Sequence, residues 1–167
     1  GHYLAVLQKA GVLSRTYQGY CRNGAEKGIN EKECREFFAF AEENLVKNIK
    51  GNFLKFGDQL YRMPEGMPSI RNLKVLRPGL HLGTLKKNRF EPSHALALAL
   101  RPDQVKHVCS LESDSPEIKA YLNGQTLNMD GEKGWYLVTV DGYSIGWGKL
   151  AGGILKNHYP KGLRKNG

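Results

Sequence analysis

The chain has 167 residues, enough for one domain or two small ones, and a composition of 40% hydrophobic and 25% charged residues is typical of a globular protein. No apolar run is long enough to span a bilayer and no secretory signal is recognisable, so we expect a cytoplasmic protein without a membrane partner. Three cysteines, Cys21, Cys34 and Cys109, lack the spacing of a disulfide framework or a zinc site, which fits a reducing compartment.

The N-terminal segments predict a strand and a linker. Tyr3 to Leu7 is a short apolar run that reads as a strand, and we expect it to be the last strand of a preceding domain. Ser14 to Asn30 is polar, contains three glycines and has no periodicity, which indicates a linker.

A helix is predicted over Glu31 to Lys50. Asn30 supplies a cap, the first turn is acidic, and Gly51 follows the last turn. Apolar residues recur at helical spacing, so we expect Phe38, Ala41 and Leu45 to be buried. Cys34 lies in this helix and is expected to be buried and unreactive.

The next segments predict short extended elements. Asn52 to Phe56 and Gln59 to Met63 flank Gly57-Asp58 and predict a hairpin. A strand is predicted over Leu73 to Leu76, and a further extended segment from Leu80 to Leu85.

The second half alternates short helices, strands and turns. Short helices are predicted from Ala95 to Leu100, from Pro102 to His107 and from Ser115 to Leu122. Strands are predicted over Gln125 to Met129 and Trp135 to Val140, and Asp141-Gly142 turns the chain into a further strand. Many short strands with turn signals favour a small barrel.

The stretch from Gly142 to Arg164 is the most informative part of the chain. Its first half alternates, which predicts Tyr143, Ile145 and Trp147 on one side of a strand and glycines on the other. Such a glycine face lets another backbone or a ligand approach closely. From Leu155 onward the sequence looks too polar for a core strand and carries cations spaced with aromatic residues, a pattern that suits RNA. The alternative is a solvated basic tail after the last strand.

The placement of charge extends this pattern. The formal charge is +9, and the segments Gly66 to Phe90 and Gly142 to Gly167 contain no acidic residue. Two such segments can fold into one positive face, as in nucleic-acid binders, or can be unrelated surface on a basic protein.

No catalytic constellation is recognisable. The sequence has no phosphate-binding glycine motif and no paired histidines at metal spacing, and Cys109 has no adjacent base. We therefore predict no catalytic residues, no metal and no cofactor site in this chain.

Three runs carry a family resemblance. WYLVTVDGYSIGWGKLAGGILKNHYPKGLR resembles the C-terminal end of RsmF-type RNA methyltransferases of the Nol/Nop/Sun family, which make 5-methylcytosine in RNA. VLRPGLHLGTLKKNRFEPSHALALAL is similar to the preceding module, and GHYLAVLQK to the end of the catalytic domain. The contexts of the family's two catalytic cysteines are absent, so methyl transfer and S-adenosylmethionine binding are not carried over.

The resemblance implies an α+β protein, a small α/β module followed by a PUA-like mixed β-barrel. We predict the end of the catalytic domain and a linker over 1–30, the α/β module over 31–110 and the PUA-like RNA-binding domain over 111–167. The expected partners are rRNA and the methyltransferase domain in cis, and a tRNA substrate stays open. A second hypothesis is a protein-interaction module, in which the aromatic helix Glu31 to Lys50 docks on the catalytic domain or another partner.

The candidate RNA contacts are basic residues that would bind phosphates and aromatic residues that would stack on bases. For Trp147 a place in the core is an equally good interpretation. The full candidate set is Lys86, Lys87, Arg89, Trp147, Lys149, Lys156, Asn157, His158, Tyr159, Lys161 and Arg164.

Overall fold

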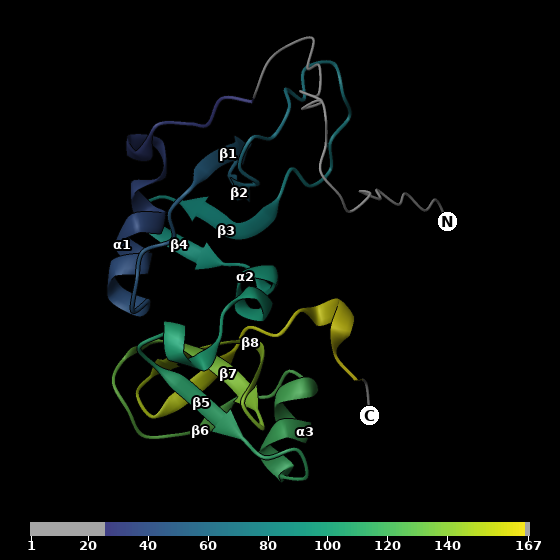
Figure 1. The fold of residues 1–167 in the computed structure, drawn as a ribbon. Helices are drawn as coiled ribbons and strands as arrows, with labels where there is room; N and C mark the ends of the chain where they lie inside the picture. The colour runs from purple at the N-terminus through teal and green to yellow at the C-terminus, as the bar shows by residue number, and fades with distance from the viewer. Residues whose placement is uncertain (1–25, 166–167) are drawn as a thin grey trace, which may run out of the picture.

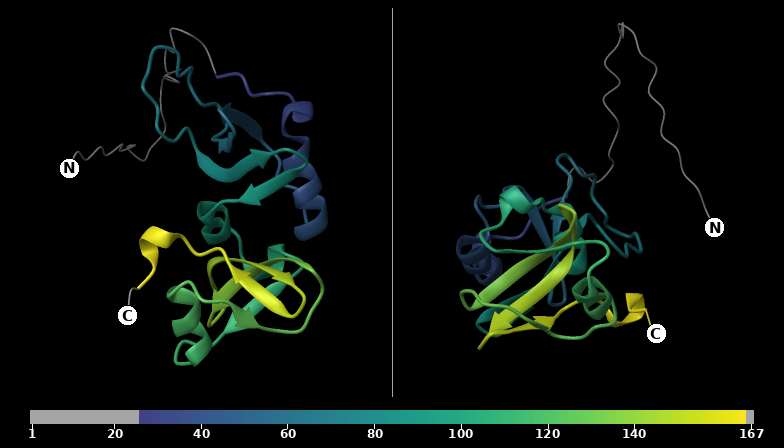
Figure 2. Two further views of the ribbon diagram at one scale, coloured as in Figure 1. Left: turned by 180° about the vertical axis from the view of Figure 1, so that it is seen from behind. Right: turned by 90° about the horizontal axis from the view of Figure 1, so that it is seen from below.

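The computed structural model describes residues 26–165, which form two sheets with helix α2 between them (Figures 1 and 2). The predicted strand Tyr3 to Leu7 and most of the predicted linker lie outside the described residues. No helix in 26–165 is both long and apolar enough to cross a membrane.

The N-terminal module is a four-stranded antiparallel meander with α1 against it. The hairpin around Gly57-Asp58 is confirmed, and so is the extended segment that begins at Leu80. Its elements are η1 (Glu31–Cys34), α1 (Arg35–Asn44), β1 (Asn52–Phe56), β2 (Gln59–Met63), β3 (Leu80–Lys86), β4 (Arg89–Pro92) and α2 (His94–Ala99).

The helix predicted over Glu31 to Lys50 is shorter than expected. Asn30 caps it as predicted, but its first turn is a 3-10 helix and α1 ends at Asn44. It ends there because Leu45 becomes extended and forms an isolated antiparallel bridge with Val105. The end of α1 is therefore set by a residue sixty positions away in the chain, a contact that helical periodicity cannot reveal.

The buried face of α1 also differs from the prediction. Phe37 and Phe40 point into the core with exposures of 0% and 4%, whereas Phe38 is only partly buried. Ala41 and Leu45 are buried as predicted. Cys34 is fully buried, and burial together with the neighbouring glutamates raises the pKa of its thiol to about 11, so it is unreactive near neutral pH.

The strand predicted over Leu73 to Leu76 is wrong. These residues lie in the loop 64–79 between β2 and β3, where Leu73 and Leu76 are 67% and 79% exposed. Within this loop no neighbouring strand pairs with them, so their apolar side chains alone do not produce a strand.

The C-terminal module is a curled five-stranded sheet in the order β5-β7-β8-β9-β6. Only β5 and β7 pair in parallel. The short β5 was not predicted. The expectation that the chain from Leu155 onward is too polar for a core strand is wrong, because β9 lies between β8 and β6 and buries Leu155. The elements are η2 (Pro102–Gln104), β5 (Val108–Leu111), α3 (Pro116–Leu122), β6 (Leu127–Asn128), β7 (Gly134–Val140), β8 (Tyr143–Ala151), β9 (Ile154–Asn157) and η3 (Lys161–Leu163).

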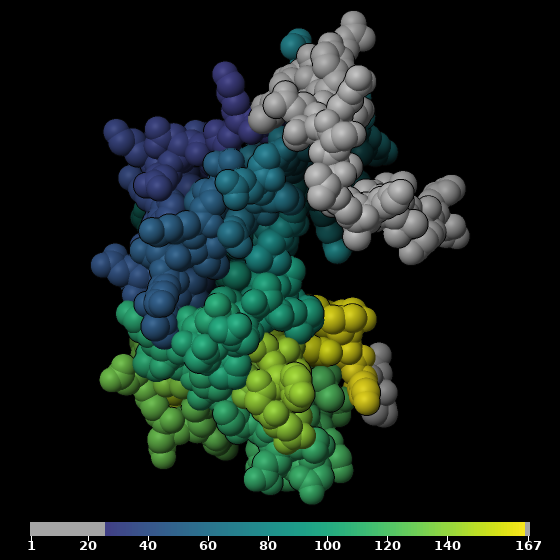
Figure 3. Space-filling view, viewed as in Figure 1, coloured from purple at the N-terminus to yellow at the C-terminus, as the bar shows by residue number. Residues whose placement is uncertain are grey.

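The two modules share one hydrophobic core. Trp135, Leu137 and Trp147 of the curled sheet belong to the same buried cluster as Phe40 of α1 and Leu96 of α2. The indole nitrogen of Trp147 donates to the carbonyl oxygen of Ser93 at 2.9 Å. In the space-filling view the atoms at the end of α1 lie directly against those of the segment that follows α2 (Figure 3).

A bulge in β8 changes which residues share a face. Val138 pairs with Gly146 but Thr139 pairs with Ser144, so Ile145 is an extra residue on β8. The C-terminal module has a second buried cluster, which contains Tyr121 and Leu155. Ile145 therefore packs against this second cluster, while Trp147 packs into the cluster shared by the two modules. The prediction that Ile145 and Trp147 lie on one side is wrong for this reason.

The glycine face of β8 is occupied by the protein itself. A Cβ at Gly146 would collide with the Tyr121 hydroxyl, and one at Gly148 would lie 2.6 Å from Leu155 Cγ. The close approach predicted from the glycines is real, but side chains of the second cluster fill it.

We expect Gly146→Ala to lower the free energy of unfolding by about 1–3 kcal/mol, because the added methyl group displaces the buried Tyr121. The matched control is Gly134→Ala, at a strand position where a Cβ would meet nothing within 4 Å. It should stay within about 0.5 kcal/mol of the parent in urea unfolding. Equal stability of the two variants would contradict the packing described for β8.

Candidate nucleic-acid interface

One row of side chains crosses the curled sheet on the face that meets the N-terminal module. Trp135 of β7 pairs with Lys149 of β8, which pairs in turn with Lys156 of β9. Directly paired residues lie on the same face of a sheet. The Lys149 ammonium lies 5.2 Å from the centroid of the Trp135 ring, a cation–π contact.

The turn between β3 and β4 presents a second group of cations. Asn88 takes a left-handed conformation (φ 57°) that reverses the chain between Lys87 and Arg89. Lys86, Lys87 and Arg89 are all exposed. Lys86 and Arg89 form surface ion pairs with Asp58 at 3.3 Å and Glu91 at 3.0 Å, which are weak enough to exchange for a phosphate.

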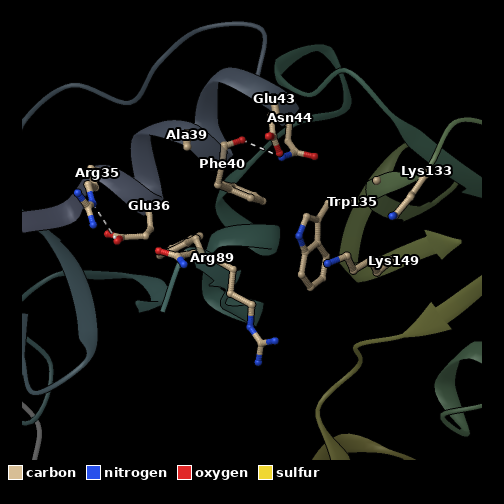
Figure 4. A pocket seen from close by; sticks show the side chains of 13 residues that line it. Arg35, Glu36, Ala39, Phe40, Glu43, Asn44, Arg89, Lys133, Trp135 and Lys149 are labelled. Carbon is tan, nitrogen blue, oxygen red and sulfur yellow. Dashed lines mark hydrogen bonds and ion pairs between the residues drawn. The ribbon is translucent and has the colours of Figure 1, made fainter. Parts of the chain in front are cut away.

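One cation of each group, Arg89 and Lys149, lines a cleft between the modules (Figure 4). The other predicted cations of these groups, Lys86, Lys87 and Lys156, do not line it. The cleft has a volume of about 560 Å³ and lies between α1, the β3–β4 turn and the start of β7. Arg89 comes from the first acid-free segment and Lys149 from the second, so the two segments do share a surface here. Arg71, Lys74 and Arg77 belong to the loop 64–79 and do not line the cleft.

Trp147 is a core residue rather than a base-stacking one. It is 2% exposed and makes edge-to-face contacts with Phe40 and Trp135, with ring centroids 6.0 and 6.3 Å apart. The structure thus shows the second of the two interpretations of Trp147, because its ring has no face left for a base.

Asn157 is held by the fold. Its amide nitrogen donates to the carbonyl oxygens of Tyr121 and Gln125, and its amide oxygen accepts from the backbone of Tyr159. With both ends of the amide engaged, Asn157 fixes the chain as it leaves β9 and thereby orients His158.

His158 reaches the row of Trp135 and Lys149. Its ring lies edge-on to Trp135 at 4.5 Å between centroids, while the residue as a whole stays exposed. Partial burial lowers the pKa of His158; Lys149 and Lys156 act in the same direction, and Glu91 opposes them.

The remaining candidates lie nearer to α2 and α3. The Tyr159 ring packs against Tyr121 and His94, with centroids 5.5 Å away in both cases. The Arg164 guanidinium donates to the Tyr159 carbonyl oxygen at 3.1 Å, and Lys161 is exposed. The structure therefore brings together a cleft group, Arg89 and Lys149 with Lys156 and His158 beside them, and a C-terminal group around Tyr159. Lys86 and Lys87 belong to neither group.

Sequence reasoning missed three residues that line the cleft: Arg35, Lys133 and Trp135. Arg35 and Lys133 are single cations in mixed surroundings. Trp135 pairs with Lys149 only because the bulge at Ile145 shifts the register by one residue. A regular hairpin counted back from Asp141-Gly142 would have placed Gly148 opposite Trp135, so the sequence offered no direct signal.

Comparison with known proteins agrees with this architecture. Residues 39–100 match the RsmF rRNA methyltransferase first C-terminal domain, and residues 109–165 match the methyltransferase RsmF PUA domain. The chain belongs to the RsmF family and corresponds to its C-terminal region.

A curated RsmF relative, ribosomal RNA small subunit methyltransferase F of Psychromonas ingrahamii (strain DSM 17664 / CCUG 51855 / 37), is 26% identical over 141 residues. The match covers 80% of this chain and spans 29% of the length of that relative. The α+β class and the PUA-like character of the second module are confirmed. The predicted division of the RsmF-type chain at residues 30 and 110 stays a prediction.

We expect Trp147→Phe to lower the free energy of unfolding by about 1–3 kcal/mol, through the lost N–H bond to Ser93 and the void left by the smaller ring. The affinity for RNA should differ by less than about twofold between the parent protein and this variant. The measurement is fluorescence anisotropy under conditions in which both proteins are folded. Weaker RNA binding by the variant, with unchanged stability, would contradict the core role and indicate that Trp147 stacks on a base.

Stability should fall on mild acidification. Burial lowers the pKa of His81, His94 and His158, so below the unfolded histidine pKa of about 6.5 the unfolded chain binds more protons. The stabilisation is present above that value and is lost as pH falls from it through the lowered pKa of the folded histidines. We expect a lower urea midpoint at about pH 5.5 than at about pH 7.5.

His94→Gln provides the check on this pH dependence. Nδ1 of His94 is buried without a hydrogen-bond partner, so protonation there is unfavourable in the folded chain. The variant should show a smaller difference between the two urea midpoints. An unchanged or larger difference would contradict this role of His94.

Proposed function

We propose that this chain is the RNA-binding region of an S-adenosylmethionine-dependent rRNA cytosine-C5 methyltransferase of the cytoplasm. In this role it positions substrate RNA for a catalytic domain elsewhere in the protein. The PUA domain match supports the proposal, and so does the rRNA methyltransferase named in the description of the first C-terminal domain.

One observation carries the RNA-binding role: cations from both acid-free segments converge on the cleft between the modules. Arg89 and Lys149 line it, and Lys156 continues the row along the sheet. Phosphate contacts of this kind fix the register and orientation of RNA without reading its sequence. This is the property that a substrate-positioning region requires.

The cofactor is assigned to the part of the protein outside this chain. A Rossmann-type methyl-donor site places the cofactor at a glycine-rich turn from a strand into a helix. The described strand-to-helix connections, Ser93 before α2 and Glu112 to Ser115 before α3, contain no glycine. The described residues do not fit such a cofactor, and we propose no catalytic step for them.

A docking role is the second candidate, on a different surface from the one first considered. The aromatic face of α1 cannot dock a partner because Phe37 and Phe40 are buried in the core. The loop 64–79 instead exposes Leu73 and Leu76, and Met67 accepts a backbone hydrogen bond from Glu26, where the described chain begins. This surface would suit the upstream part of the same protein.

The RNA-binding role predicts salt-dependent affinity. Each phosphate neutralised by a lysine or arginine releases counterions, so log Kd should rise with log salt by about 0.7–0.9 per contact. Lys156→Ala and Lys161→Ala should each reduce this slope by about one contact. The measurement is fluorescence anisotropy with an rRNA helix-loop across a salt series.

Lys47→Ala is the matched control for this experiment. Lys47 is an exposed lysine on the segment after α1, and it lies outside the cleft. Its removal should leave the slope unchanged. The assignment fails if binding is independent of salt, or if Lys156→Ala and Lys47→Ala reduce the slope equally.

A further inference from the structure

We propose that the cleft between the modules binds one unpaired nucleotide of an RNA, with its phosphate among Arg89, Lys133 and Lys149 and its base against Trp135. This inference rests on the proposed RNA-binding function and adds the kind of RNA feature that is recognised. The walls of the cleft come from α1, the β3–β4 turn and β7–β8, so the site exists only because the two modules are joined (Figure 4).

The size of the cleft favours a single nucleotide. Its volume of about 560 Å³ lies within the range of about 300–1,000 Å³ that is typical of small-molecule pockets. A base-paired helix is far too wide to enter, whereas a nucleotide that has left its stack can be taken up from a helix bound outside.

The charge of the lining favours a phosphate. Four cations, Arg35, Arg89, Lys133 and Lys149, line the cleft with two acids, Glu36 and Glu43, and Arg89 is paired with Glu91 at 3.0 Å. Arg35 is already paired with Glu36 at 3.2 Å. Within the described residues, neither Lys133 nor Lys149 forms an ion pair with an acidic side chain. Lys149 instead makes the cation–π contact with Trp135. Two ammonium groups are therefore available for an anion.

The contact of Lys149 with Trp135 suggests how the nucleotide enters. Trp135 is 8% exposed, and in the free protein its ring is in contact with the Lys149 ammonium, 5.2 Å from the ring centroid, and with the His158 ring, 4.5 Å away between centroids. A phosphate attracts the ammonium more strongly than an aromatic ring does. When Lys149 turns to the phosphate, the uncovered edge of Trp135 is free to contact the base.

The polar groups at the α1 side of the cleft favour bases with an amino group. The Asn44 amide nitrogen donates to the Phe40 carbonyl oxygen at 2.8 Å, which leaves its oxygen as an acceptor. Glu43, one helical residue away, adds a carboxylate. Both groups accept hydrogen bonds, so cytosine, whose N4 donates, suits the cleft better than uracil, whose O4 accepts.

The test uses three RNAs: a perfect duplex, the same duplex with one bulged cytidine, and the same duplex with one bulged uridine. At fixed salt we expect the parent protein to bind the cytidine bulge about tenfold more tightly than the duplex, and the uridine bulge with intermediate affinity. Trp fluorescence of the Trp147→Phe protein, in which Trp135 is the remaining tryptophan, should change with the bulged RNA and not with the duplex.

Two cleft variants and one control locate the effect. Lys133→Gln removes the unpaired ammonium, and Ala39→Phe fills the cleft from the exposed face of α1 without changing charge. Both should reduce the bulge preference to less than about twofold while duplex binding by Ala39→Phe is kept. Lys47→Gln, which changes the same charge outside the cleft, should retain the preference.

The outcomes separate this inference from the proposed function. If the parent protein binds duplex and bulged RNA equally, or if Ala39→Phe keeps the preference, the nucleotide site is overturned while RNA binding stands. If none of the RNAs binds at low salt, the proposed function itself fails. A preference for uridine over cytidine would overturn the assigned role of Glu43 and Asn44.

Discussion

The burial of Trp147 is the interaction on which the rest of the structure depends. Its ring meets Phe40 of α1 and Trp135 of β7, and its N–H bonds to Ser93 at the start of α2. A buried indole stabilises the fold through its large apolar area, and the hydrogen bond of its N–H group fixes the orientation of the ring. It fixes β8 against two helices of the other module, so one of the two buried clusters extends across both modules.

The cleft is a consequence of this joint core. Arg89 stands on one module and Lys149 on the other, and a flexible connection between them would leave their separation undefined. A fixed separation allows phosphates to be held in one register, which is what positioning requires. The cleft group and the C-terminal group around Tyr159 are connected through this packed core, so an RNA that contacts both would be oriented relative to the module pair.

The two tryptophans are both buried, but only Trp135 also lines the cleft. Trp147 lies among glycines and cations and resembles a binding residue, yet it is buried; Trp135 lies in an apolar run and resembles a core residue, yet its edge reaches the cleft beneath Lys149. The bulge at Ile145 causes both results, because one extra residue reverses the faces of the strand. Alternation predicts a face only while the register is unbroken.

The sequence by itself determined the features that depend on neighbouring residues. These are the cap at Asn30, the hairpin at Gly57-Asp58, the helix after Ser93, the acid-free segments and the family resemblance. The tertiary structure decided what depends on distant partners. The bridge between Leu45 and Val105 ends α1, the missing partner strand leaves Leu73 in a loop, and the core around Trp147 brings Arg89 to Lys149. Caps and turns are short-range interactions that a few adjacent residues specify, whereas a cleft requires the relative placement of two sheets, which only the packed core fixes.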